Sequence, residues 1–176
     1  DIWKLSAQET ASFIQKRELS AHDSVGAALA RLDAVNPNLN AVVEPLAETA
    51  LKQAKALDQL QADGGSLGPL HGVPVTIKIN IDQDGCATSN GVVAFKDIIA
   101  QADAPVVENL KKAGAVIIGR TNTPEFSFRA DTQNPLFGRT HNPWGKHLSA
   151  GGSSGGAGAA VMAGIGALAH GNDIGG

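Results

Sequence analysis

Apolar residues recur at helical spacing through the N-terminal third of the chain. Residues 6–9 (SAQE) have the form of a capping box, in which a serine and a glutamate satisfy each other's backbone N–H groups, and apolar residues follow at helical intervals. Ser20 precedes a second helical pattern, which we expect Pro37 to end, and residues 46–61 are rich in Ala, Leu, Lys and Gln. The pattern therefore predicts an N-terminal helical region over residues 1–67.

Strand and helix patterns alternate through the rest of the chain. Strands are indicated by β-branched apolar runs, and helices by apolar residues that recur on one helical face. The expected elements are strands over 73–81, 115–119 and 165–169, helices over 104–113 and 154–163, and an irregular, proline-containing connection over 121–149. Because helices alternate with apolar strands, we expect an α/β fold with a mixed or largely parallel central sheet flanked by helices.

Composition and charge narrow the classes of partner. Of the 176 residues, 43% are hydrophobic and 18% are charged, which is typical of a globular chain with a sizeable core. The formal net charge is −3, without a block of like charges, so we expect neither a nucleic-acid partner nor a membrane surface. The first residues lack the basic and apolar regions of a signal peptide, so we expect a cytoplasmic location. Cys86 is the only cysteine, which argues against a disulfide or a cysteine-based metal site.

Lys78 stands out because its ammonium group lies in the apolar run VTIKIN. Burial disfavours the charged form of a lysine and can lower its pKa by several units, which would provide a neutral amine as a general base near neutral pH. The alternative is a lysine on an edge strand whose long side chain reaches solvent. The segment alone leaves both interpretations open.

The glycine-rich segment 151–156 (GGSSGG) places Ser153 and Ser154 among glycines, directly before a predicted helix. Glycines allow close approach of the backbone, and free N–H groups at a helix N-terminus can bind an anion or a developing oxyanion. A phosphate loop is disfavoured because the GxxxxGK[ST] pattern is absent. A nucleophile elbow matches GxSxG at both serines, but the preceding residues make a poor strand. A Gly/Ser turn with a capping serine is a further alternative.

The other candidate groups carry weaker signals. Residues 172–176 (NDIGG) form a second glycine turn, whose N–H groups could stabilise negative charge or serve only as a turn. The five histidines have no metal-ligand spacing and no recognisable acid partner, so we expect no metal site, and no local signature singles out a Ser-His-Asp triad. Glu125 and Asp131 could pair for glycoside chemistry, but nothing in their polar loop indicates the raised pKa that a catalytic acid needs.

The order of these segments resembles the amidase signature family. The segments GPLHGVPVTIKIN, AGAVIIGRTNTPEF, NPLFGRTHNPW, AGGSSGGAGAAV and GNDIGG look like those of the family, in its order and at its spacing. The resemblance runs from Gly68 to Gly176, and the preceding helices also fit the family. It implies the amidase signature fold, with 1–67 as the N-terminal helical region and 68–176 as the first part of an incomplete core. It also implies that the chain is the N-terminal portion of a longer enzyme.

The resemblance further implies a Ser-cisSer-Lys triad. Lys78 matches the family's catalytic lysine and Ser153 its bridging serine, which has a cis peptide bond in the family. The nucleophilic serine would be the residue just after Gly176. Neutral Lys78 would take a proton from Ser153, which relays one from the nucleophile, and would later return it to the leaving amine.

The remaining site residues follow from the same motifs. They are Ile174, Gly175 and Gly176 as N–H donors of the oxyanion hole, Ser154 and Asp173 as supports for the lysine and its loop, and Ser127 and Phe128 as acyl-pocket residues. Many members of the family have an acidic residue after the lysine, whereas this chain has Ile79. Neighbouring side chains on a strand point to opposite faces, so we expect this departure to leave Lys78 unaffected.

These implications make an amide-bond hydrolase that works through an acyl-enzyme the first hypothesis. The expected substrate is a small-molecule amide, and no metal or organic cofactor is expected. One alternative is the glutaminase (A) subunit of a tRNA-dependent amidotransferase, which would need partner subunits. Another is a non-catalytic fragment, since the expected nucleophile is not among the 176 residues. The family acts on fatty acyl, aryl, peptide and small amides alike, so the sequence leaves the substrate open. A homodimer is the candidate assembly.

Overall fold

The computed structural model describes residues 1–175 and has an α/β architecture. Its central sheet has the strand order β1 (Val42–Pro45), β3 (Val116–Thr121), β2 (Pro74–Lys78) and β6 (Leu168–Ala169). Strands β3, β2 and β6 run parallel, and β1 is antiparallel to β3. The prediction of an α/β fold with a mixed sheet and flanking helices is therefore confirmed.

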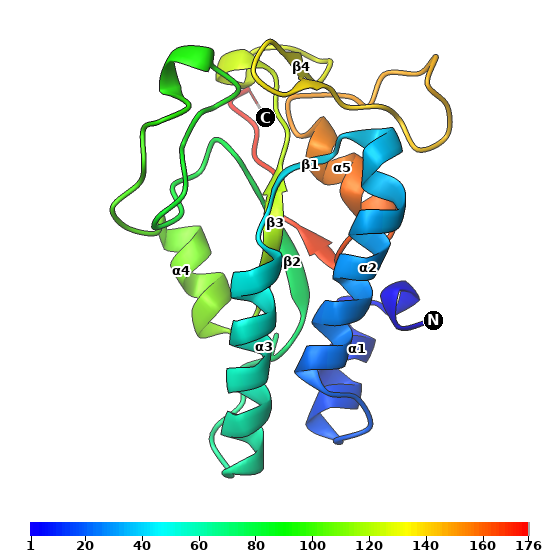
Figure 1. Cartoon of the computed structure of the whole chain (residues 1–176), viewed down its shortest axis with the longest axis vertical. Coiled ribbons are helices and arrows are strands. Elements are labelled where there is room, and N and C mark those ends of the chain that lie inside the picture. Colours follow the sequence, from blue (N-terminus) through cyan, green and yellow to red (C-terminus); the bar gives the residue numbers. More distant parts are fainter. Residues whose placement is uncertain (176) are drawn as a thin grey trace.

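Helices cover both faces of this sheet (Figure 1). The helices are α1 (Ala7–Gln15), α2 (Ala21–Leu39), α3 (Ala47–Ala62), α4 (Pro105–Lys112) and α5 (Gly155–Met162). Buried residues of α2, α3 and α5 form one apolar cluster with β3, whereas α4 packs with β2 in a second cluster on the other face. The segment from β2 through α4 to β3 is the αβ unit that the sequence pattern predicts.

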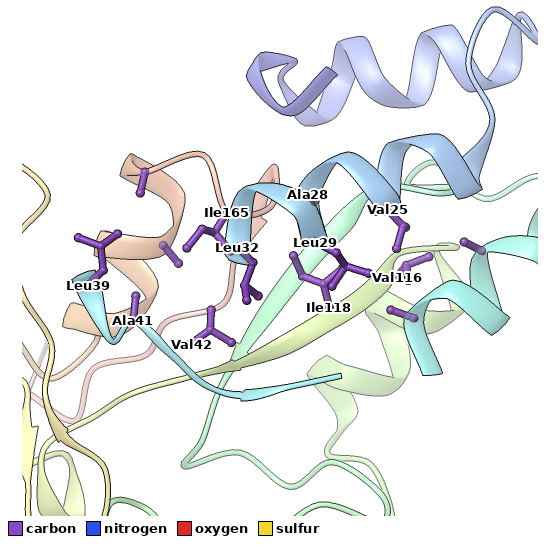
Figure 2. Close-up of a cluster of buried hydrophobic side chains, with 14 of the residues drawn as sticks. Val25, Ala28, Leu29, Leu32, Leu39, Ala41, Val42, Val116, Ile118 and Ile165 are labelled. Atoms are coloured by element: carbon purple, nitrogen blue, oxygen red, sulfur yellow. The ribbon is translucent and has the colours of Figure 1, made fainter. Parts of the chain in front are cut away.

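The larger core cluster lies between α2 and β3. Figure 2 shows Val25, Leu29 and Leu32 of α2 pointing toward Val116 and Ile118 of β3. These three helical positions recur at the spacing that brings side chains onto one face, while alternate strand residues point to the same side of the sheet. The apolar pattern of α2 therefore determines which of its faces is buried.

The predicted capping residues begin α1 and α2, but α2 is longer than expected. Ser6 Oγ accepts from the Glu9 N–H at 3.2 Å and completes a capping box, and Ser20 Oγ accepts from the third helical N–H of α2 at 2.9 Å. The prediction that Pro37 ends α2 is wrong, because the helix continues to Leu39. A proline removes only one N–H donor, and the Asn40 N–H still bonds the carbonyl four residues earlier at 2.7 Å.

Several short elements were not expected from the sequence. The edge strand β1 follows α2 directly and consists of four residues, too few for a clear alternation. The connection between β3 and α5 contains a 3₁₀ turn and a small hairpin rather than irregular chain alone. The short elements are η1 (Ile2–Lys4), η2 (Val93–Phe95), η3 (Glu125–Ser127), β4 (Gln133–Asn134) and β5 (Gly138–Arg139).

The sheet brings several loops together at one edge. The carboxyl ends of the parallel strands β2, β3 and β6 share this edge, where open α/β folds place their ligands. The division into residues 1–67 and 68–176 stays a prediction. Within residues 1–175, no helix combines the length and the apolar character needed to cross a bilayer.

Candidate active site

Lys78 is the last residue of β2, at the carboxyl end of the sheet. Because Val75 and Ile77 pack on the side of α4, strand alternation turns Lys78 to the other face, where α5 begins. Strand β2 lies between β3 and β6, and the Lys78 side chain is fully buried. The alternative of an edge-strand lysine that reaches solvent is therefore wrong.

The Lys78 amine lies among oxygen atoms from two other segments. Its Nζ is 2.7 Å from Ser153 Oγ and 3.1 Å from Ser154 Oγ. It is also 2.9 Å from the side-chain oxygen of Asn172 and 3.3 Å from the carbonyl oxygen of the same residue. The structure thus brings the predicted pair Lys78 and Ser153, 75 residues apart in the sequence, into direct contact.

Burial governs the ionisation of this amine. Removal from water lowers the pKa of Lys78 from 10.5 to about 8, and the carboxylate of Asp173 opposes part of this shift. The pKa of His170, which follows β6, is also lowered by burial and then by the charge of Lys78. A lysine with such a pKa has a significant neutral fraction near neutral pH, which a general base requires.

The backbone around Ser153 is held by contacts with other segments. The peptide bond between Gly152 and Ser153 is cis, and the Ser153 carbonyl oxygen accepts from Thr123 Oγ1 at 3.0 Å. A Cβ atom at Gly152 would overlap the carbonyl oxygen of Arg129. Glycine is therefore required at this position, because two backbone segments approach each other there.

Ser154 precedes α5 but does not act as its cap. Among the described residues, its hydroxyl makes no capping hydrogen bond to the helix. The Ser154 oxygen accepts from Lys78 instead, and its hydroxyl donates to the carbonyl oxygen of Asn172 at 3.1 Å. The interpretation of this segment as a Gly/Ser turn with a capping serine is wrong, because both serine side chains are directed at the lysine.

The turn after β6 lies beside these residues. The Gly175 N–H donates to Asp173 Oδ1 at 2.9 Å, and the side chain of Ile174 is 66% exposed. Gly176, the third residue expected in the oxyanion hole, lies outside the described residues. A cavity of about 250 Å³ opens next to the turn, and its lining includes Ser153, Ser154, Asn172 and Asp173.

The two residues expected in the acyl pocket have different surroundings. Ser127, in η3, is buried, and its hydroxyl lies 3.1 Å from Asn80 Nδ2 and 3.1 Å from Asn90 Oδ1. Phe128 is 77% exposed. Phe126 and Ser127 both have positive φ angles, 54° and 58°, a conformation that is rare for residues other than glycine. The structure brings Ser127 into contact with residues around the lysine and leaves Phe128 on the surface.

Sequence reasoning missed two groups at this edge of the sheet. The sequence pattern indicates only a glycine turn at Asn172, although an amide side chain next to the DIGG motif is a usable signal. Arg120 of β3 is fully buried, and its guanidinium binds Glu44 at 3.2 Å and the carbonyl oxygens of Ala87 and Ile81 at 2.5 and 2.7 Å. No local pattern indicates this role, because arginine side chains are mostly exposed.

The remaining candidates lie outside this cluster of contacts. Asp131 accepts from Ser149 at 2.5 Å and pairs with Arg139 at 3.5 Å. Over residues 1–175, no three His, Cys, Asp or Glu side chains gather closely enough to hold a metal ion. A larger groove of about 380 Å³, lined in part by Arg31 and Trp144, contains none of the predicted site residues.

Comparisons with known proteins agree with this arrangement. The sequence pattern that defines the Amidase family matches residues 23–176. An indoleacetamide hydrolase from Bradyrhizobium diazoefficiens is 61% identical over 175 residues, which are 99% of this chain and 33% of that protein. A subunit of the glutamyl-tRNA(Gln) amidotransferase from Carboxydothermus hydrogenoformans is 42% identical over 176 residues, which are 100% of this chain and 36% of that protein. The chain spans about a third of the length of these curated relatives.

A solved structure, that of a fatty acid amide hydrolase, shares the fold. It matches 99% of this chain and 31% of its own length, with a TM-score of 0.95 and 35% sequence identity. Sequence and fold therefore agree over nearly all of the 176 residues. The chain belongs to the amidase signature family.

Proposed function

We propose that the full-length protein hydrolyses amide bonds with a Ser-cisSer-Lys triad, through an acyl-enzyme. The observation that carries this proposal is the 2.7 Å contact between the buried amine of Lys78 and Ser153 Oγ. An amine with a pKa of about 8 beside a hydroxyl group suits general base catalysis near neutral pH. The proposed nucleophile is a serine at the position just after Gly176.

The proton follows one route in both directions. Lys78 Nζ accepts the proton of Ser153, and Ser153 accepts the proton of the nucleophile as the nucleophile's oxygen bonds to the substrate carbonyl carbon. When the C–N bond breaks, the proton on Lys78 returns through Ser153 to the nitrogen, because an unprotonated amine is a poor leaving group. Water then repeats the attack on the ester and restores the nucleophile.

The turn after β6 is the proposed oxyanion hole. The backbone N–H groups of Ile174, Gly175 and Gly176 would stabilise the negative charge on the carbonyl oxygen, and each such donor is worth about 3 to 4 kcal/mol. Asp173 is proposed to shape this turn, since its carboxylate accepts from the Gly175 N–H. Ser154 is proposed to support the lysine through its 3.1 Å contact.

The substrate class is proposed from the relatives. The 61% identity with an indoleacetamide hydrolase supports a small amide with an aromatic acyl group. Phe128 is proposed to pack against that group, with Ser127 as its neighbour in the acyl pocket, because aromatic rings stack favourably. The proposed enzyme is cytoplasmic and needs no nucleic acid, and light scattering of the full-length protein would show whether it is a homodimer.

Ammonia release from a panel of amides, including indoleacetamide, tests the proposal. Lys78→Ala should reduce activity to background without loss of the fold, because the proton acceptor is gone. Lys55→Ala is the matched control, since Lys55 lies on the exposed side of α3, and it should keep the parental rate. Parental activity in Lys78→Ala would refute the mechanism.

A second candidate function is the glutaminase subunit of a tRNA-dependent amidotransferase. It is favoured by the 42% identity over the whole chain with the amidotransferase relative. Glutamine hydrolysis that depends on copurifying subunits and rises with tRNA and ATP would favour this function. Rapid hydrolysis of aryl amides by the protein alone would favour the first proposal.

A further inference from the structure

Two asparagine side chains form a reciprocal pair beside the lysine. Asn80 Nδ2 donates to Asn172 Oδ1 at 3.0 Å, and Asn172 Nδ2 donates to Asn80 Oδ1 at 3.3 Å. Asn80 lies just after β2 and Asn172 in the turn after β6, so the pair joins two segments that border the site. Neither amide carries a proton in the mechanism proposed above, yet Asn172 Oδ1 lies 2.9 Å from Lys78 Nζ.

The donors and acceptors around Lys78 leave one arrangement for its neutral form. A neutral amine has two N–H groups and one lone pair. Asn172 Oδ1 is only an acceptor, so it takes the first N–H. Ser154 gives its own proton to the Asn172 carbonyl oxygen, so the Ser154 oxygen takes the second N–H. The lone pair of Lys78 is then directed at Ser153, whose proton it can accept.

Asn80 holds the Asn172 amide in this orientation. If the Asn172 amide were rotated by half a turn, its NH₂ group would face the N–H groups of Lys78 and of Asn80. Asn80 Nδ2 is placed in turn by the buried hydroxyl of Ser127, 3.1 Å away, which also contacts Asn90 Oδ1 at 3.1 Å. This series of contacts determines which atom of Asn172 faces the lysine.

We propose that Asn172 is a positioning residue of the reaction, held by Asn80, and that its side-chain oxygen directs the lone pair of Lys78 at Ser153. The inference rests on the function proposed above. The titratable groups that act on Lys78 are Asp173, in the same turn, and His170, after β6. The Asn172 amide is uncharged, so its contribution is the direction of a hydrogen bond.

Variants of the full-length protein, assayed for kcat and KM across the pH range, test this role. Asn172→Ala should lower kcat about tenfold or more and leave KM within about twofold, because the lone pair loses its direction while substrate contacts remain. Asn172→Asp keeps an oxygen acceptor of the same shape but adds a charge that favours the ammonium form. It should therefore be impaired near neutral pH and recover at high pH, which Asn172→Ala should not do.

A double-mutant cycle tests the part played by Asn80. Asn80→Ala should lower kcat less than Asn172→Ala does, and the double variant should be no slower than Asn172→Ala alone, because Asn80 acts through Asn172. Asn38→Ala is the matched control, since Asn38 lies on the exposed side of α2, and it should retain the parental kcat.

The outcomes separate this inference from the proposed function. Parental kcat in a folded Asn172→Ala, or equal losses in both Asn172 variants at every pH, would overturn the inference. If Asn172→Ala does not fold, the high-pH recovery of Asn172→Asp and the loss in Asn80→Ala decide the question. Activity in Lys78→Ala would overturn the proposed function itself. An inactive Lys78→Ala beside unaffected Asn172 variants would overturn only the positioning role.

Discussion

Raising the pH from about 7 to about 9 should increase kcat/KM of the full-length protein about tenfold. In the proposed mechanism only the neutral amine of Lys78 accepts a proton, so kcat/KM follows its neutral fraction. Burial lowers the pKa of Lys78 to about 8. The neutral fraction is then about one tenth at pH 7 and about nine tenths at pH 9, which sets the size of the increase.

The assay measures initial rates of ammonia release well below KM, in buffers of constant ionic strength. The unfolding temperature is recorded at each pH, so that loss of folded protein is not counted as loss of activity. Lys55→Ala should give the same profile as the parent. A flat profile, or one that falls between pH 7 and 9, would refute the reasoning, because no group with a pKa of about 8 would then need to lose its proton.

The same pKa shift predicts how folding stability depends on pH. The unfolded lysine, with its ordinary pKa of 10.5, holds a proton in a range where folded Lys78 has lost it. The unfolded state therefore binds more protons between about pH 8 and 10.5, and the free energy of unfolding should rise with pH in this window. The contribution of Lys78 is about 3 kcal/mol across it, and denaturant unfolding of the parent and Lys78→Met would reveal the difference.

Substitutions in the scaffold test the packing around the site. Gly152→Ala should lower activity and destabilise the fold by about 1 to 3 kcal/mol, because its Cβ would overlap the backbone of Arg129. Gly158→Ala in α5 is the matched control, since nothing lies within 4 Å of the new Cβ, and it should stabilise the fold by about 0.5 to 1 kcal/mol. Arg120→Met should cost about 3 kcal/mol or more in denaturant unfolding, because Glu44 and two loop carbonyl groups lose a buried partner. Parental unfolding curves for Gly152→Ala or Arg120→Met would contradict these explanations.

Local sequence patterns determined most of the secondary structure. Ser6 and Ser20 were identifiable as helix caps because a cap and its N–H partner lie within one turn of each other. The apolar run that ends at Lys78 was recognisable as a strand, and the alternation of helices and strands indicated an α/β fold. The end of α2 and the strand β1 were missed, because the burial of Leu39 and the pairing of Val42 with Thr121 involve distant segments.

The sequence by itself also singled out Lys78 and the GGSSGG segment, but it left their surroundings undecided. Only the tertiary structure shows that β2 is an interior strand, that Ser154 faces the lysine instead of capping α5, and that Asn172 completes the contacts of the amine. These contacts join segments 75 to 94 residues apart. Local periodicity reports which face of an element is buried, but the partner that a buried polar group meets depends on how the elements pack.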